Sequence, residues 1–189
     1  MSKKLDGFRE WAGRNLKWFE LIVGLFACIA AYIALWPIIS AWFRPAEPKP
    51  TIPSSAVIVQ QETVNVSATE YWHDTGITVQ KGGWLELTAT GSWWSGISTT
   101  GPDGAGGLFR PACGRCPVTD GNLGELVGKI GGSPPFRIGS STIRAVSQDG
   151  NLLLAMNENT GPCKDGRDGS CYEDNNGVLE VIVTVRRIK

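Results

Sequence analysis

The most constraining feature of this sequence is a long apolar run near its N-terminus. Residues 21–43 contain no charged side chain, and an α-helix of this length would extend roughly 35 Å. The hydrocarbon core of a bilayer is about 30 Å thick, so the run is long enough to cross it. A cleaved signal peptide has a shorter apolar region, about 7–15 residues, followed by a small-residue cleavage site. This run has no clear site of that kind, so we predict a transmembrane helix over residues 21–43.

Basic residues flank this run unequally. Lys3, Lys4, Arg9, Arg14 and Lys17 precede it, whereas only Arg44 and Lys49 follow it closely. Cytoplasmic flanks carry the excess of Lys and Arg, so residues 1–20 are expected to be cytoplasmic. This tail is either an amphipathic segment along the inner leaflet or a solvated segment. Everything after the span would then lie in the periplasm or outside the cell, anchored by a single pass through the cytoplasmic (inner) membrane.

A linker and one domain follow the predicted span. Residues 44–55 hold four prolines, which favour an extended, semi-rigid spacer. Residues 56–189 are long enough for one domain with its own core. In that domain, 11 Lys and Arg against 14 Asp and Glu give a net charge of −3. This balance offers no electrostatic basis for nucleic-acid binding.

The pattern of this domain is all-β. Residues 84–90 alternate, placing Leu85, Leu87 and Ala89 on one face, and 178–187 alternate in the same way. Residues 77–84 read as strand, tight turn and strand. The other predicted strands are 63–68, 126–130, 136–138, 142–146 and 152–156. Short strands separated by glycine-rich breaks predict a β-sandwich or jelly roll.

Four cysteines lie in predicted loops of this domain, namely Cys113, Cys116, Cys163 and Cys171. A tetrahedral zinc site and a redox-active C-x-x-C are possible readings, but the first is mostly intracellular and the second needs a helix N-terminus. Structural disulfides fit an oxidising compartment better. The sequence does not decide their connectivity: the bridges are either Cys113–Cys116 with Cys163–Cys171, or two bridges between these pairs.

Two oxygen-rich clusters flank the last predicted strands. Glu158 follows strand 152–156, and Asp174 and Asn175 precede strand 178–187. If the two strand ends are close together, these side chains meet at one rim. Carboxylate, amide and backbone oxygens are the ligands that Ca²⁺ prefers. The alternative is ordinary turn formation, for which Asp, Asn and the Asn-Gly pair are well suited.

Several motifs together resemble one known family. They are Trp72 to Ile77, Gly91 to Trp94, Gly101 to Gly104, the block Gly124 to Gly131, Leu152 to Glu158, and Asp174 to Gly177. In this order they resemble the PA-IL family of galactophilic bacterial lectins, over nearly all of the predicted domain. The resemblance implies a small jelly-roll β-sandwich with a calcium ion at one end, which the protein shares with vicinal sugar hydroxyls.

The resemblance also implies the residues of that site. Carried over by motif, the metal ligands are Ser95 (or Gly96) through a backbone carbonyl, and the side chains of Glu158, Asp174 and Asn175. The carbohydrate contacts implied are Trp94, Asp103, Asn157 and Asn176. This chain departs from the family where Glu158 stands in place of the usual Asp, in an insertion over 160–172, and in its own cysteines within 103–121.

Trp93 and Trp94 are adjacent, so in a strand one should pack in the core and the other lie near the rim, where a sugar can stack on it. Catalysis has little support, because the chain has one histidine and no activated nucleophile is evident. We therefore expect a non-enzymatic, membrane-anchored lectin-like protein that binds a glycan or envelope polysaccharide with calcium. The alternative is an accessory or assembly subunit that contacts other envelope proteins.

Overall fold

The computed structural model describes residues 50–105, 114–161 and 169–189. These residues belong to one compact unit, Lys49–Lys189. Within them, no helix is long and apolar enough to cross a membrane. The predicted tail over 1–20 and the predicted span over 21–43 lie outside the described residues, as does the first half of the proline-rich linker, residues 44–49.

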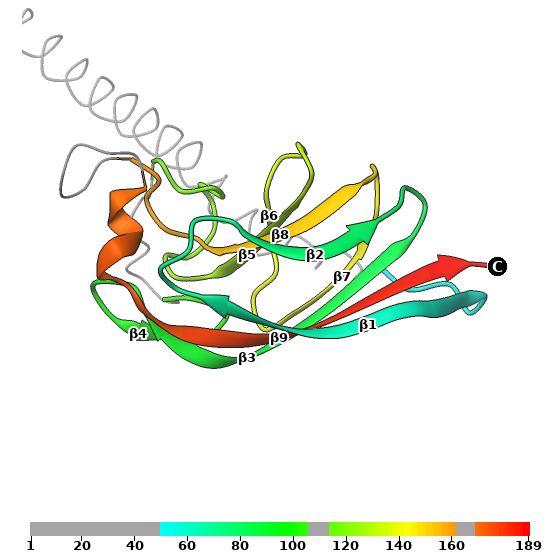
Figure 1. The fold of residues 1–189 in the computed structure, drawn as a ribbon, viewed down its shortest axis with the longest axis horizontal. Helices are drawn as coiled ribbons and strands as arrows, with labels where there is room; N and C mark the ends of the chain where they lie inside the picture. Colours follow the sequence, from blue (N-terminus) through cyan, green and yellow to red (C-terminus); the bar gives the residue numbers. More distant parts are fainter. Residues whose placement is uncertain (1–49, 106–113, 162–168) are drawn as a thin grey trace, which may run out of the picture. The chain divides into compact units, whose positions relative to one another are not determined.

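The described residues form two antiparallel sheets that pack face to face (Figure 1). The first has the order β1 (Ala56–Ser67), β9 (Asn176–Ile188), β3 (Trp84–Trp94) and β4 (Thr99–Thr100), with β7 (Ser141–Ala145) also paired to β3. The second has the order β2 (His73–Val79), β8 (Gly150–Met156), β5 (Leu126–Ile130) and β6 (Phe136–Arg137). A short 3₁₀ helix, η1 (Ser170–Asp174), leads into β9. The prediction of an all-β domain built as a sandwich is thus confirmed for the described residues.

The core forms where the inner faces of the sheets meet. Leu85 and Leu87 of β3 are fully buried, and the alternate residues of β9 that point inward are buried too: Leu179, Val181, Val183 and Val185. The second sheet contributes Leu126, Ile130, Leu152, Leu154 and Met156 to the same cluster. Burial of these side chains, at about 25 cal/mol per Å² of apolar surface, is the main force that holds the two sheets together.

One outward position of β9 departs from the predicted alternation. Thr184 is buried although its neighbours Glu180 and Ile182 on the same face are exposed. β9 is flanked on both sides, and Thr184 pairs with Gln61 of β1 and Glu86 of β3. Since it is central in the sheet, longer side chains from both neighbours screen its short side chain from solvent.

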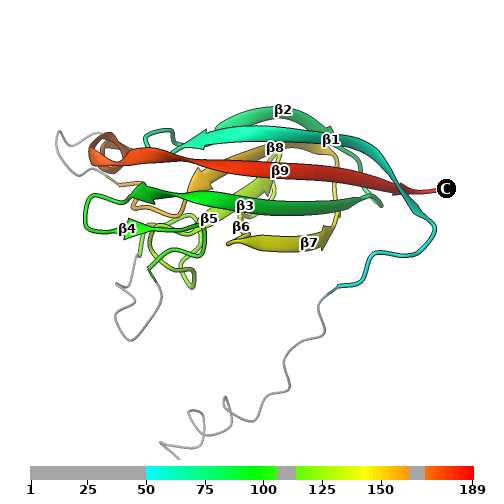
Figure 2. The same cartoon turned by 90° about the horizontal axis from the view of Figure 1, so that it is seen from below.

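The predicted strands lie where the pattern placed them, but one turn connects them differently. β2 pairs with β8, whereas β3 pairs with β9, so the turn over 80–83 is a corner between sheets and not a hairpin. Ile77 and Val79 face the core from one sheet, and Leu85 and Leu87 face it from the other. Gly82 adopts a positive φ of 85° at this corner, a conformation that glycine enters without strain. Seen from below, β1, β9, β3 and β7 run side by side across the first sheet (Figure 2).

Candidate functional site

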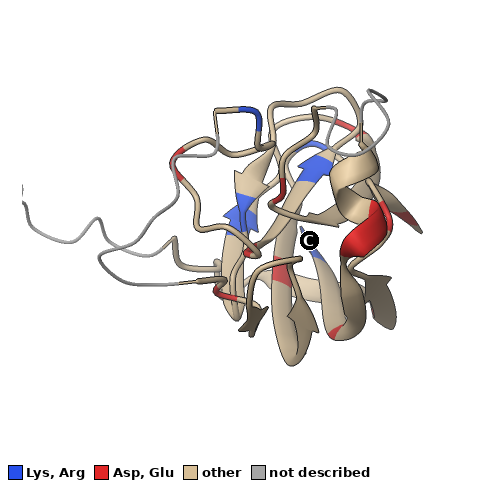
Figure 3. Cartoon of the chain, turned by 90° about the vertical axis from the view of Figure 1, so that its left-hand side faces the viewer, with Lys and Arg blue, Asp and Glu red and all other residues tan. Residues whose placement is uncertain are grey.

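The candidate site lies at the end of the sandwich where β3 finishes and β9 begins. The ladder between these strands ends at the pair Trp94 and Asn176, so the turn after β3 and the helix η1 before β9 are neighbours. Figure 3 looks onto this end, with the acidic residues of η1 in red. The loops that follow β1 and β8 reach the same end (Figure 1). Four segments distant in sequence therefore converge there.

The turn after β3 packs against the Asp174 carboxylate. The Ser95 N–H and hydroxyl both donate to Ser98 O, at 3.0 and 3.1 Å, which closes the turn tightly. A Cβ placed on Gly96 would be 3.2 Å from Cγ and from both carboxylate oxygens of Asp174. The structure thus brings Ser95 and Asp174, two of the predicted ligands, to the same place.

Glu158 supplies a buried carboxylate at this rim. Its Oε1 accepts the Asn159 N–H at 2.7 Å, and its Oε2 is buried without a hydrogen-bond partner. Burial raises the pKa of the Glu158 carboxyl, and the negative charge of Asp174 raises it further. Glu158 and Asp174 belong to opposite sheets, so the two clusters meet across the sandwich and not along neighbouring strands.

Asn175 contributes a buried amide. Its Nδ2 donates to Ala68 O at 3.2 Å, which fixes the orientation of the amide group. Its Oδ1 is buried and has no hydrogen-bond partner. A buried acceptor left unpaired in this way is destabilising by about 1–3 kcal/mol unless something else satisfies it.

These side chains form a set of oxygen donors suited to a hard cation. Among the described residues, only three buried side-chain oxygens lack a hydrogen-bond partner, namely Asn122 Oδ1, Glu158 Oε2 and Asn175 Oδ1. Two of the three belong to predicted metal ligands. No three His, Cys, Asp or Glu side chains in the described part of the chain gather as a metal-holding group. The set at the rim is instead two carboxylates, one amide and backbone carbonyls, which is the composition that fits calcium.

One of the two adjacent tryptophans is buried and the other is exposed, as the sequence predicts. Trp93 is 1% exposed, and its Nε1 donates to Gly124 O at 2.7 Å. Trp94 is 41% exposed and lies directly opposite Asn176 in the β3–β9 ladder. Asn176 is also exposed, although its Oδ1 accepts the Gly177 N–H at 2.7 Å. Trp94 and Asn176 therefore form an accessible pair beside Asp174 and Asn175.

Two other predicted sugar contacts have structural roles here. Asn157 is fully buried, and its side chain accepts the Val118 N–H and donates to Val118 O and Asn122 O. A sugar cannot reach it, so its place as a direct contact needs correction: it holds the loop over 118–122 against Glu158. Asp103 is exposed, and its Oδ1 accepts the Ser140 N–H at 2.7 Å.

The sequence did not indicate a buried carboxylate behind the rim that pairs with an exposed arginine. Glu125 is 3% exposed, and its Oε1 lies 2.8 Å from Arg137 Nε. Its Oε2 accepts the Asn122 N–H, and its backbone carbonyl accepts the Asn157 N–H. The Glu125 side chain raises the pKa of the Arg137 guanidinium through this hydrogen bond. The one sequence signal for the structural role of Glu125 is its position in the block 124–131, which begins and ends with glycine.

The described cysteines are buried near the same end. Cys116 and Cys171 are both buried and both disulfide-bonded. Cys113 and Cys163 lie outside the described residues, so the predicted pairing remains a prediction. Thr160 donates to Arg115 O through its N–H and its hydroxyl, which joins the segment that contains Cys116 to the one that follows Glu158.

Gly177 allows β9 to approach β3 closely, which leads to a testable prediction. Its φ is 99°, and a Cβ there would lie 2.8 Å from Trp93 Cα and 2.9 Å from Ser92 O. Gly177→Ala should therefore lower the free energy of unfolding by about 1–3 kcal/mol. Gly132→Ala is the matched control, because a Cβ at Gly132 meets nothing within 4 Å. Equal denaturation midpoints for the two variants would contradict this close approach.

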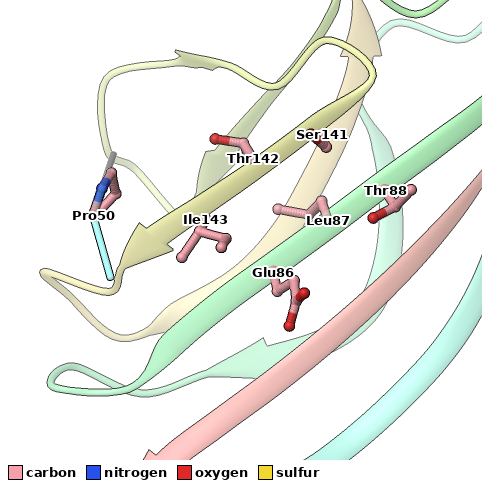
Figure 4. Close-up of a pocket in the computed structure, with 7 residues that line it drawn as sticks. All are labelled: Pro50, Glu86, Leu87, Thr88, Ser141, Thr142 and Ile143. Carbon is pink, nitrogen blue, oxygen red and sulfur yellow. The ribbon is translucent and has the colours of Figure 1, made fainter. Parts of the chain in front are cut away.

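A surface pocket lies elsewhere on the first sheet. It sits between β3 and β7 and is lined by Pro50, Glu86, Leu87, Thr88, Ser141, Thr142 and Ile143 (Figure 4). Its β3 residues, Glu86, Leu87 and Thr88, belong to the half of that strand remote from Trp94, and none of the predicted ligands lines the pocket. Its hydroxyl and aliphatic lining holds no cluster of titratable groups.

Comparison with known proteins gives a limited result. Among solved structures, the N-terminal domain of EclA, described as a PllA-like lectin, is similar. The match has a TM-score of 0.45 and 19% sequence identity, and it covers 70% of this chain and 99% of that chain. No family model matches the chain, and a search of the curated proteins found no match. Similarity at this level does not assign a function, so the site is interpreted from its own geometry.

Proposed function

We propose that this protein binds glycans with the help of a calcium ion held at the rim. One observation carries the proposal: Glu158 Oε2 and Asn175 Oδ1 are buried, unpaired acceptors, and both residues neighbour Asp174. Asn175 follows Asp174 in the chain, the Asp174 charge acts on Glu158, and Asp174 itself packs against the Ser95–Gly96 turn. A cation would satisfy both acceptors and relieve the repulsion between the two carboxylates. The motif resemblance described above points to the same residues.

The ligand that fits this arrangement is a sugar with two neighbouring hydroxyls. Bound calcium supplies positive charge and open coordination positions, which favour hydroxyl oxygens. Trp94 presents an exposed ring for the apolar C–H face of the sugar, and Asn176 offers an amide beside it. A galactoside, or an envelope polysaccharide that contains one, is the class we propose.

We further propose where the protein acts. Residues 21–43 would anchor it in the cytoplasmic membrane with the N-terminus inside, and the sandwich would lie on the far side. Disulfides that involve Cys113, Cys116, Cys163 and Cys171 suit that oxidising compartment. We also propose that the sandwich is a jelly roll and that the protein is not an enzyme.

The proposal is tested by titration of methyl β-galactoside into the full chain, held in a polyoxyethylene detergent that carries no sugar. We expect heat of binding with 1 mM calcium and its loss with excess chelator. Trp94→Ala should weaken binding by about tenfold, because stacking of this kind is worth about 0.5–1.5 kcal/mol. The control Ile188→Ala removes an equally exposed apolar side chain far from the rim and should bind like the wild type. Binding that is indifferent to calcium would refute the role of the cation.

One observation favours the accessory-subunit alternative. β1 is an edge strand of the first sheet, and Ile58 and Val59 near its start are about half exposed. Among the described residues of β1, Glu62 is the only charged one, whereas edge strands are often protected by charge. Stoichiometric co-purification of another envelope protein, lost in the variant Val59→Lys, would support this second function.

A further inference from the structure

A second exposed aromatic side chain contacts η1, the short helix that carries Asp174. Tyr71, in the loop between β1 and β2, is 48% exposed. Its ring is 5.3 Å from that of Tyr172 and 6.0 Å from that of Trp72, both in tilted contact. Two ring contacts fix the Tyr71 ring while nearly half of the residue remains open to solvent. Such a preorganised ring loses little conformational entropy when a ligand stacks on it.

Tyr71 is one ring away from the candidate calcium ligands. Tyr172 belongs to η1, which ends at Asp174, and its hydroxyl donates to Met156 O at 2.7 Å, two residues before Glu158. The loop that carries Tyr71 also accepts the Asn175 amide at Ala68 O. The position of Tyr71 is therefore tied to both sides of the proposed site.

The backbone of this loop is strained at Trp72, the residue after Tyr71. Trp72 has a φ of 63° and is the only non-glycine among the described residues with a positive φ. A bulky residue in this region costs about 1–3 kcal/mol. Trp72 packs onto the outer cluster of Val118, Val127 and Ala155, and Lys129 Nζ lies 4.4 Å from its ring centre. Trp72 is therefore packed against the protein surface, whereas its neighbour Tyr71 remains exposed to solvent.

A carboxylate accompanies the exposed ring. The Glu70 side chain is 48% exposed, and its Oε2 lies 2.7 Å from His73 Nδ1. This contact fixes the carboxylate of the residue that precedes Tyr71 in the chain, and its other oxygen can accept a hydroxyl. A flat ring beside a fixed carboxylate is an arrangement that suits a sugar, which offers one apolar face and several hydroxyl donors.

We propose that the rim binds a glycan of at least two sugar residues, with one sugar at the cation and Trp94 and the next sugar stacked on Tyr71 beside Glu70. This inference rests on the proposed function, because it places the second sugar relative to the first. It names the ligand as an oligosaccharide and assigns Tyr71 as the residue that discriminates it from a monosaccharide.

The test compares methyl β-galactoside with α1,4- and β1,4-linked galactobiose, using the full chain in sugar-free detergent with calcium. We expect one of the disaccharides to bind about tenfold tighter than the monosaccharide, and Tyr71→Ala to reduce this gain to less than about twofold. The gain is the ratio of the two affinities measured on the same variant, so a general loss of sugar affinity does not affect it. Tyr71→Phe should retain the gain, and Tyr71→Leu, which keeps an apolar contact for Tyr172 but no flat ring, should lose it.

The outcomes separate the two proposals. Calcium-dependent binding of the monosaccharide without any gain for either disaccharide would overturn the Tyr71 subsite and leave the proposed function standing. An equal gain in Tyr71→Ala and in the wild type would also overturn the subsite. Loss of all calcium-dependent sugar binding in the wild type would refute the proposed function, and the subsite with it.

Discussion

Replacement of Trp93 with alanine should lower the free energy of unfolding by about 3–5 kcal/mol, the usual range for a large buried aromatic. Trp93 is 1% exposed and donates from Nε1 to Gly124 O at 2.7 Å. The variant therefore opens a cavity and also leaves a carbonyl without this donor. Because Trp93 joins β3 to the block at 124–131, the loss should reach the turn that carries Ser95. Urea denaturation followed by circular dichroism measures the effect.

The neighbouring tryptophan is the matched control for this prediction. Trp94→Ala removes the same side chain from a position that is 41% exposed, so its effect on the free energy of unfolding should be below about 1 kcal/mol. Its effect on sugar binding should be the larger one. If the two variants were equally unstable, the division into a core and a rim tryptophan would be wrong.

The variant Glu158→Gln should separate the stability of the metal-free protein from its response to calcium. Calcium at about 100 times its Kd should stabilise the wild type by about 2.7 kcal/mol. The variant loses a charged ligand, so its calcium affinity should fall by about a hundredfold or more. Thermal unfolding with calcium and with chelator measures both. The control Glu86→Gln, remote from the rim and paired with Arg186, should respond to calcium like the wild type.

Titration of Glu158 should make the stability of the metal-free wild type depend on pH, and the sign of this dependence is defined. Burial and the Asp174 charge raise the pKa of Glu158, so the folded, metal-free protein holds this proton more tightly than the unfolded chain. The resulting stability is present below the ordinary carboxyl pKa and is lost as the pH rises through the raised value. Glutamine is neutral throughout, so Glu158→Gln should be more stable than the wild type at pH 7 in chelator. A less stable variant under those conditions would contradict the assignment of Glu158 as a buried, unpaired carboxylate.

Strand positions could be predicted from the sequence because the alternation of apolar and polar residues marks the face of a strand that packs on the core. Strand 126–130 agrees at both ends with β5, and the inward face of β9 is buried as expected. Pairing was harder, because a glycine-rich turn serves a hairpin and a corner between sheets equally well. The turn over 80–83 was predicted, but the sequence did not show that its two strands belong to different sheets. β4, with two residues, is too short to show any periodicity.

The site could be predicted in part. The pattern of motifs named Ser95, Glu158, Asp174 and Asn175, and the structure brings all four to one rim. Asn157 was assigned to the sugar although it points inward. It lies just after the end of β8, where the alternation of a strand no longer tells which of two adjacent residues faces the solvent. The roles of Glu125 and Tyr71 depend on contacts between segments distant in sequence, which no local pattern contains.

The most direct test of the account is a calorimetric titration of calcium into the metal-free full chain at pH 7. We expect one calcium ion to bind per chain in the wild type and in Glu86→Gln, and no measurable binding in the double variant Glu158→Gln, Asp174→Asn. The absence of calcium binding in the wild type, or undiminished binding in the double variant, would contradict the rim site and the calcium-assisted function proposed from it.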